Sequence, residues 1–204
     1  MDRLGNVMEY GHVILFGGSF DPIHKGHMDA IATLQNTCPE SLVIVMPSKN
    51  RLKDSSLIPI DIRYQSVLAS FRSWKNVVVV DWTLYRDTSS TYEVVQMIKK
   101  LYPQAKITVA VGEDVLSSLP RWKHYDKLTS EINWSFFLRH GGAIIAGLQD
   151  EVLKNLVSQS QIIDYKFEEL SSTQIRSAET FPEGIIPQEA FSIVLPYLKL
   201  KAGN

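Results

Sequence analysis

Short runs of β-branched and aromatic residues alternate along this chain with longer stretches whose apolar residues recur at helical spacing. This alternation is typical of parallel strands, because each return to the same end of a sheet needs a crossover that a helix supplies. We therefore expect a doubly wound α/β sheet, mostly parallel, of five to six strands with helices on both faces. The predicted strands are His12–Phe16, Leu42–Met46, Val77–Val80, Ile107–Val111, Trp134–Leu138 and a weaker Gln161–Tyr165.

Apolar residues three and four positions apart predict the helices that cover this sheet. Leu68, Leu101 and Phe191 lie on the apolar stripes of these helices, so we expect their side chains to be buried. The predicted helical segments are residues 28–34, 64–74, 93–102, 115–119, 125–128, 173–178 and a last one from residue 187 onward.

The composition is that of an ordinary globular protein, with 45% hydrophobic residues among 204, and it favours one domain, residues 1–204. The formal net charge of −1 provides no overall field that would attract nucleic acid or an anionic membrane. No apolar run approaches the ~20 residues that span a bilayer. With one cysteine, Cys38, and no apolar leader, we expect a cytoplasmic protein, and a homo-oligomer stays open.

Glycine and polar residues follow four of the predicted strands. Ligands of open parallel sheets bind in the crevice at the carboxyl ends of the strands, so these positions are the first candidates for a site. The four strand ends are residues 17–19, 47–49, 112–114 and 139–142.

His24 and His27 lie three residues apart at the start of the first predicted helix, just after Gly17 and Gly18. The glycines let a phosphate approach the backbone, and Ser19 adds a hydroxyl donor. Two imidazoles on one face of a helix N-terminus can stabilise the charge that develops in a displacement at phosphorus. The alternative is an ordinary tight turn with two unrelated histidines, which the combination of features disfavours.

Ser172 or Thr173 is placed to cap the predicted helix 173–178, and hydroxyl and amide groups there suit an anion. Arg176 follows on the same face, where its planar guanidinium can grip phosphate oxygens. The alternative is an ordinary helix cap with a surface arginine.

Gly112, Asp114 and Trp122 suit a nucleotide in a different way. Gly112 permits close approach after the fourth strand, and Asp114 can accept hydrogen bonds from ribose hydroxyls. Trp122 offers an aromatic face to a pyridinium ring. Taken singly, Asp114 also fits a helix cap and Trp122 a core aromatic residue.

Three segments together resemble motifs of the nucleotidylyltransferase superfamily. Residues 17–27 resemble its Gly-Gly-Ser/Thr-Phe-Asp-Pro-x-His-x-Gly-His signature, and residues 170–176 resemble its Ile-Ser-Ser-Thr-x-x-Arg motif. Residues 111–128 look like the Gly-x-Asp-x-Leu-x-x-Leu-Pro-x-Trp-Lys segment of nicotinate and nicotinamide mononucleotide adenylyltransferases. The resemblance runs, with gaps, from residue 12 to about residue 198.

The resemblance implies a Rossmann-like fold and an enzyme of NAD biosynthesis. It implies transfer of AMP from ATP, accompanied by Mg²⁺, to the phosphate of nicotinate or nicotinamide mononucleotide, with release of pyrophosphate. The C-terminal helical part, about residues 171–200, would complete the ATP site. The implied catalytic residues are His24, His27 and Arg176. The implied ATP-binding residues are Gly17, Gly18, Ser19, Phe20, His24, His27, Gly112, Asp114, Arg139, Ser172, Thr173 and Arg176. The implied mononucleotide-binding residues are Ser19, Lys49, Thr91 and Trp122.

Two segments depart from the family pattern. The loop after the second strand lacks the usual Pro-Pro-His-Lys, so Lys49, Arg51 and Lys53 are either phosphate ligands or part of a solvated basic loop. Residues 90–93 read Ser-Thr-Tyr-Glu where the family typically has Ser-Tyr-Thr-x-Asp. In the family this segment helps to read the nicotinate carboxylate, so nicotinate and nicotinamide both stay open as the acceptor.

Other functions remain as alternatives. One is another transferase of the superfamily, such as pantetheine-phosphate adenylyltransferase, and a second is a non-catalytic nucleotide-binding regulator. A zinc site is a minor alternative, since His24 and His27 have only Asp21 nearby as a further ligand. We therefore expect no metal held by the protein alone.

Overall fold

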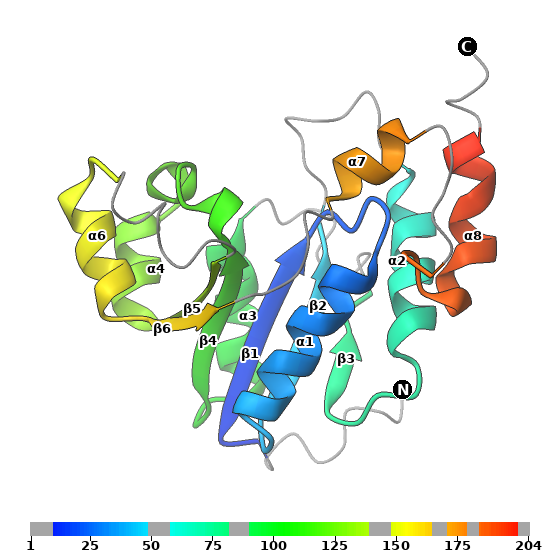
Figure 1. Ribbon diagram of the computed structural model, residues 1–204. Helices are drawn as coiled ribbons and strands as arrows, with labels where there is room; N and C mark the ends of the chain where they lie inside the picture. Colours follow the sequence, from blue (N-terminus) through cyan, green and yellow to red (C-terminus); the bar gives the residue numbers. More distant parts are fainter. Residues whose placement is uncertain are drawn as a thin grey trace.

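The computed structural model describes residues 10–48, 58–81, 90–138, 148–164, 171–178 and 184–199. Its six strands form one sheet in the order β3-β2-β1-β4-β5-β6, and every neighbouring pair is parallel (Figure 1). The predicted strands and the doubly wound parallel sheet are confirmed. The strands are β1 (His12–Gly18), β2 (Leu42–Pro47), β3 (Val77–Val79), β4 (Lys106–Gly112), β5 (Asn133–Leu138) and β6 (Gln161–Asp164).

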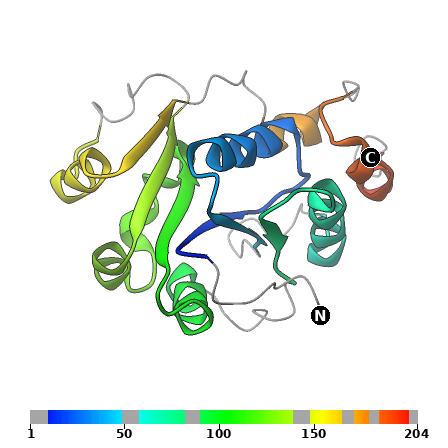
Figure 2. The same cartoon turned by 90° about the horizontal axis from the view of Figure 1, so that it is seen from below.

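Helices lie on both faces of the sheet, as the view along the strands shows (Figure 2). None of the helices in the described ranges is both long enough and apolar enough to cross a membrane. The helices are α1 (Lys25–Thr37), α2 (Ile60–Phe71), α3 (Thr91–Leu101), α4 (Tyr125–Glu131), α6 (Glu151–Ser158), α7 (Ser172–Ser177) and α8 (Gln188–Lys199).

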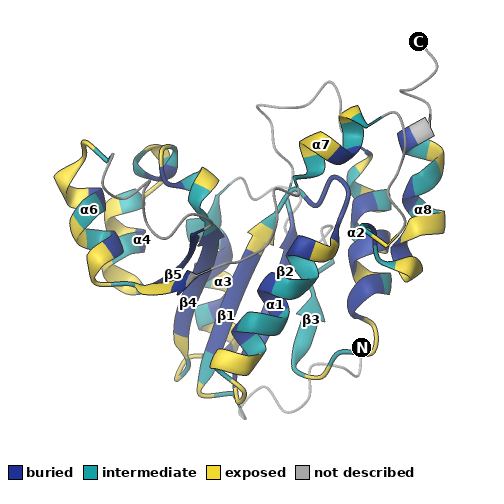
Figure 3. Cartoon of the chain, in the orientation of Figure 1, coloured by how far each residue is buried: buried dark blue, intermediate teal, exposed yellow. Residues whose placement is uncertain are grey.

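Alternate residues of the central strands supply two separate cores. Val13 and Leu15 of β1 belong to the core that α3, α4 and α6 cover. Ile14 and Phe16 belong to the core that α1, α2, α7 and α8 cover. Strand β2 is buried along its whole length, as a strand covered on both faces must be (Figure 3). The apolar runs that predicted the strands are therefore runs with two buried faces.

The direction of the strand order changes between β1 and β4. Strands β2 and β3 extend the sheet on one side of β1, while β4, β5 and β6 extend it on the other. Crossovers that diverge in this way leave a crevice at the carboxyl ends of the two central strands. Gly18 ends β1 and Gly112 ends β4, so two of the predicted strand ends meet at this crevice.

Several sequence predictions need correction. The side chains of Leu68, Leu101 and Phe191 are exposed, at 39%, 49% and 37%, because the apolar stripe of each helix is wider than the face that the helix buries. Two turns of 3-10 helix, Glu113–Val115 and Leu119–Arg121, replace the helix predicted at 115–119. Helix α6 was not predicted, although Asp150 caps it by accepting hydrogen bonds from two backbone amides.

Candidate active site

A cavity of about 670 Å³ opens at the crevice between β1 and β4. That volume lies within the range of about 300–1,000 Å³ that is usual for small-molecule sites. The ends of the two strands, the starts of α1 and α3, and helix α7 line it. In the described ranges, all the predicted ATP-binding residues line this cavity: Gly17, Gly18, Ser19, Phe20, His24, His27, Gly112, Asp114, Ser172, Thr173 and Arg176.

The predicted acceptor residues Thr91 and Trp122 line the same cavity. Ser19, predicted to contact both substrates, lines it as well. Lys49 and Arg139 lie outside the described residues, as do Arg51 and Lys53. The structure therefore brings together residues from segments that are far apart in the sequence.

The turn from β1 to α1 is tightly packed. A Cβ atom on Gly18 would lie 3.2 Å from the ring of Phe20, so a side chain there would have to displace the ring. Phe20 itself has a φ of 46°, in the left-handed region, and its ring is buried. The ring centroid of Phe20 lies 4.8 Å from that of His27. Phe20 is thus a packing support for the second histidine as well as part of the cavity wall.

The two histidines lie side by side at the start of α1. His24 is the N-cap residue and is only 5% exposed, and the centroids of the two rings are 3.8 Å apart. The backbone N–H of His24 donates to Nδ1 of His27 at 3.3 Å. Because an N–H donates to Nδ1, that nitrogen carries the lone pair and the proton of neutral His27 lies on Nε2. His27 therefore has a ring N–H donor on the side away from its own backbone.

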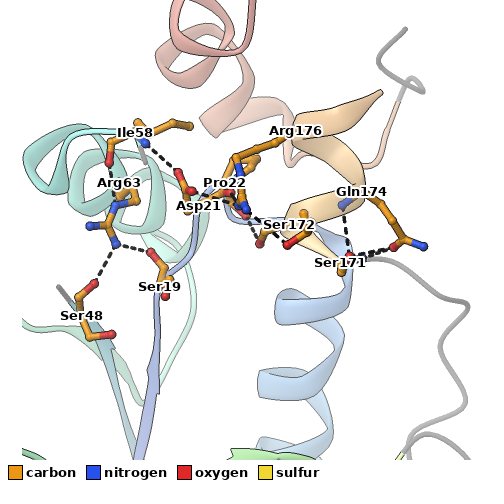
Figure 4. Close-up of polar contacts among 11 residues, drawn as sticks. Ser19, Asp21, Pro22, Ser48, Ile58, Arg63, Ser171, Ser172, Gln174 and Arg176 are labelled. Carbon is orange, nitrogen blue, oxygen red and sulfur yellow. Dashed lines mark hydrogen bonds and ion pairs between the residues drawn. The ribbon is translucent and has the colours of Figure 1, made fainter. Parts of the chain in front are cut away.

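Helix α7 is attached to the turn between β1 and α1. Ser171 is the N-cap residue and forms a capping box with Gln174, so the prediction of Ser172 or Thr173 as the cap is wrong by one or two residues. The hydroxyl of Ser172 instead donates to the carbonyl of Pro22 at 3.0 Å (Figure 4). That bond joins residues 150 positions apart, and it holds α7 beside the start of α1.

Arg176 is held by an ion pair with Asp21. Its Nη1 atom lies 3.0 Å from Oδ2 of Asp21 and donates to the backbone carbonyl of the same residue at 2.6 Å. Its Nη2 atom donates to the hydroxyl of Thr173 at 3.2 Å. The guanidinium is thus fixed at the cavity wall by contacts on both of its terminal nitrogens.

A second, buried arginine supports the ends of β1 and β2. Arg63 in α2 is 3% exposed and donates from Nε to the carbonyl of Ile58 at 2.8 Å. Its Nη1 atom donates to the carbonyl of Ser48 at 2.8 Å and to the carbonyl of Ser19 (Figure 4). The N–H of Ile58 donates in turn to Oδ1 of Asp21 at 2.8 Å. Arg63 and Asp21 are thereby linked through the peptide groups of one residue.

The part of the cavity around Thr91 and Trp122 is lined by half-buried and exposed side chains. Ser90 caps α3, and Glu93 accepts from the hydroxyl of Ser90 at 2.9 Å and pairs with Lys123 at 2.7 Å. Trp122 is partly buried, and its ring centroid lies 6.2 Å from that of Trp134. Tyr92, the aromatic residue that departs from the family pattern, does not line the cavity, and its ring packs at 4.8 Å from His124.

His12 lies at the opposite end of the sheet. Its ring nitrogens are 2.7 Å from Oγ of Ser41 and 2.8 Å from Oγ1 of Thr108. Burial, with a smaller contribution from Lys106, lowers the pKa of His12. The ring is therefore neutral at pH 7 and links β1, β4 and the segment before β2 by hydrogen bonds.

A family model described as cytidylyltransferase-like matches residues 15–178, which include both histidines of α1 and Arg176. The chain belongs to the cytidylyltransferase-like family. This membership agrees with the motifs at residues 17–27 and 170–176, and both motifs lie within the matched range.

Curated relatives of this cytidylyltransferase-like protein carry the name probable nicotinate-nucleotide adenylyltransferase. The relative from Leptospira interrogans is 28% identical over 193 residues, which cover 90% of this chain and 92% of the relative. The relative from Clostridium tetani is 26% identical over 191 residues, covering 90% of this chain and 96% of the relative.

Solved structures share the fold of this family member. Plasmodium falciparum nicotinic acid mononucleotide adenylyltransferase complexed with NaAD matches with a TM-score of 0.73 and 19% identity, over 96% of this chain and 99% of that chain. A crystal structure from Vibrio parahaemolyticus, described as that of a "putative nicotinate-nucleotide adenylyltransferase", matches with a TM-score of 0.65 and 19% identity, over 95% of this chain and 96% of that chain. At these identities the likeness shows the fold.

Three charged residues in or beside this cavity were given no role in substrate binding or catalysis by the sequence predictions. Asp21 lies inside the first motif, but its partner is remote in the sequence. Arg63 shares a helix face with the buried Val67, and a cation on an apolar face was the available signal. Arg121 also lines the cavity, and its place beside Trp122 was the only clue.

Proposed function

We propose that this protein is a nicotinate-nucleotide adenylyltransferase, which joins nicotinate mononucleotide to the AMP part of ATP and releases pyrophosphate. The observation that carries the proposal is that His24, His27 and Arg176 line the same cavity as Thr91 and Trp122. One part of that wall suits a triphosphate and the other suits an aromatic mononucleotide. The curated relatives, which this chain matches over 92% and 96% of their length, carry names that support the same reaction.

The phosphate of the mononucleotide is the nucleophile in this proposal. One of its oxygens forms a bond to the α-phosphorus of ATP, and the bond from that phosphorus to the bridging oxygen of pyrophosphate breaks. The attacking phosphate is already ionised, so no general base is needed. Catalysis then depends on positioning and on stabilising the charge of the transferring group.

The two histidines and Arg176 would supply that stabilisation. The proton on Nε2 of neutral His27 makes the ring a hydrogen-bond donor. Gly17 and Gly18 line the cavity and would present their backbone to phosphate oxygens, and Arg176 adds a full positive charge at the cavity wall. On the acceptor side, the ring of Trp122 suits the positively charged pyridine ring of the mononucleotide.

Magnesium would enter the site with ATP. In the described part of the chain, no three His, Cys, Asp or Glu side chains lie close enough together to hold a metal ion. A Mg²⁺ that accompanies ATP would be held mainly by phosphate oxygens and water, and it would offset part of the charge of the triphosphate. A cytoplasmic location, expected from the single cysteine, belongs to the same proposal.

A comparison of acceptors tests the proposal. The purified protein is given ATP and Mg²⁺ with nicotinate mononucleotide, nicotinamide mononucleotide or phosphopantetheine, and pyrophosphate release is measured. We expect the highest kcat/KM with nicotinate mononucleotide. A preference for phosphopantetheine would indicate another transferase of the superfamily, and ATP binding without pyrophosphate release would indicate a regulator.

A further inference from the structure

We propose that Asp21 is a positioning residue, which holds the guanidinium of Arg176 in the orientation that contacts the phosphates of ATP. The inference rests on the proposed function, because that function assigns Arg176 to the triphosphate. Asp21 itself acts through Arg176 and is not assigned a contact with substrate.

The contacts of Arg176 define its orientation. Nη1 of Arg176 lies 3.0 Å from Oδ2 of Asp21 in an ion pair and donates a hydrogen bond to the backbone carbonyl of Asp21 at 2.6 Å. Thr173 receives Nη2 at 3.2 Å. An arginine side chain has several rotatable bonds, and an unsupported one would lose much of its conformational entropy on binding phosphate. Contacts from two separate segments remove most of that cost before the ligand arrives.

The carboxylate of Asp21 is fixed as firmly as its partner. Its residue is fully buried, at 0% exposure. Its Oδ1 atom accepts from the N–H of Ile58, and the carbonyl of Ile58 accepts from Arg63, both at 2.8 Å. Arg63 is in turn anchored on the carbonyls of Ser19 and Ser48 (Figure 4). Asp21 is therefore a rigid support, tied to the ends of two strands.

Two effects of the Asp21 charge oppose each other. A carboxylate near the cavity repels a triphosphate, so its removal alone would strengthen ATP binding. If the carboxylate positions Arg176, its removal weakens ATP binding, because the guanidinium loses its ion pair and keeps only its contacts with the backbone carbonyl of Asp21 and the hydroxyl of Thr173. The sign of the change in ATP affinity therefore separates a positioning role from simple repulsion.

Asp21→Asn is the deciding variant, because it removes the charge and keeps an oxygen for the N–H of Ile58. We expect kcat/KM for ATP to fall about tenfold, and the Kd of ATP measured by calorimetry to rise, while KM for the mononucleotide changes less than about twofold. Asp21→Ser, which also removes the charge, should change ATP affinity in the same direction. Asp126→Asn is the control, since Asp126 is exposed on α4 and outside the cavity lining.

The Arg176→Ala background shows whether Asp21 acts through the arginine. In that background, Asp21→Asn should lower kcat/KM for ATP by less than about twofold, because the interaction is already absent. The proposal is overturned if Asp21→Asn binds ATP as tightly as the wild type or more tightly, or if its full effect persists without Arg176. A wild-type protein that binds ATP but forms no dinucleotide contradicts the proposed function alone, and the calorimetric comparison still decides the role of Asp21.

Discussion

The two walls of the cavity are built in different ways. The wall formed by the β1–α1 turn and α7 is cross-linked by buried groups, among them Asp21 at 0% and Arg63 at 3% exposure. The wall formed by the start of α3 and the segment after β4 is linked by a solvent-exposed ion pair between Glu93 and Lys123, whose side chains are 35% and 51% exposed. Asp114 on that wall is exposed as well.

This difference corresponds to the demands of the proposed reaction. The transferring phosphoryl group develops its charge at one place, and fixed donors stabilise that charge without reorganising. The acceptor must instead enter, be recognised by its ring and leave as part of a larger product. We infer that the first wall determines the rate of the chemical step and that the second determines which acceptor is used.

The largest effect is expected from the histidines of the first wall. His24→Ala or His27→Ala should lower kcat by about 10²–10³-fold, because each removes a preorganised donor to the transferring group. The melting temperature should fall by only a few degrees, because His24 is a buried N-cap residue and His27 packs on Phe20. The matched control is His124→Asn, which alters an exposed histidine in the left-handed backbone region, where asparagine is tolerated. Near-normal turnover in both histidine variants would contradict the inference that this wall determines the rate of the chemical step.

The next effect is on stability. Arg63→Met should lower the free energy of unfolding by about 3 kcal/mol, because the buried carbonyl of Ile58 and the half-buried carbonyls of Ser19 and Ser48 lose their donor. Urea denaturation measures it, and Arg72→Met at the exposed end of the same helix provides the control. A loss below about 0.5 kcal/mol, which is typical of substitutions at surface residues, would show that the hydrogen bonds of Arg63 do not stabilise this wall.

A smaller and more selective effect is expected at Trp122. Trp122→Ala should raise KM for the mononucleotide about tenfold and leave KM for ATP unchanged, because only the acceptor loses its aromatic contact. Trp122→Phe keeps a ring and should retain most of the affinity. Equal increases in both KM values would contradict the division of the cavity into two walls.

The smallest effect is expected from the exposed ion pair. Glu93→Gln should cost about 0.5 kcal/mol of stability or less, and less than about twofold in kcat/KM, because solvent screens exposed pairs of this kind. Thermal unfolding and steady-state kinetics with both substrates measure the two changes. A loss of tenfold or more in kcat/KM would show that the acceptor wall is as firmly organised as the first.

The parts that the sequence predicted well depend on local patterns. The strands are runs with two buried faces, and the β1–α1 turn combines glycines with His24 and His27 within a few positions. Both histidines line one cavity, and predicting that placement needed only the end of one strand and the first turn of the next helix. Trp122 and Thr91 were predicted through the family resemblance, and the structure places both at the cavity.

The parts that were missed depend on contacts between remote segments. Asp21 and Arg176 are 155 positions apart, and Arg63 and Ser19 are 44 positions apart. No spacing rule can pair such residues. The exposed Leu101 and Phe191 show a related limit, since an apolar stripe does not reveal which of its edges the neighbouring element covers.

The most direct test follows the α-phosphorus of ATP. The protein is incubated with Mg²⁺, nicotinate mononucleotide and ATP labelled at the α-phosphorus, and the products are separated and identified by mass. If AMP is transferred to nicotinate mononucleotide, we expect the label in nicotinate adenine dinucleotide and none in the pyrophosphate. Label in free AMP or ADP, or ATP consumption without a dinucleotide, would contradict attack at the α-phosphorus and with it the proposed function.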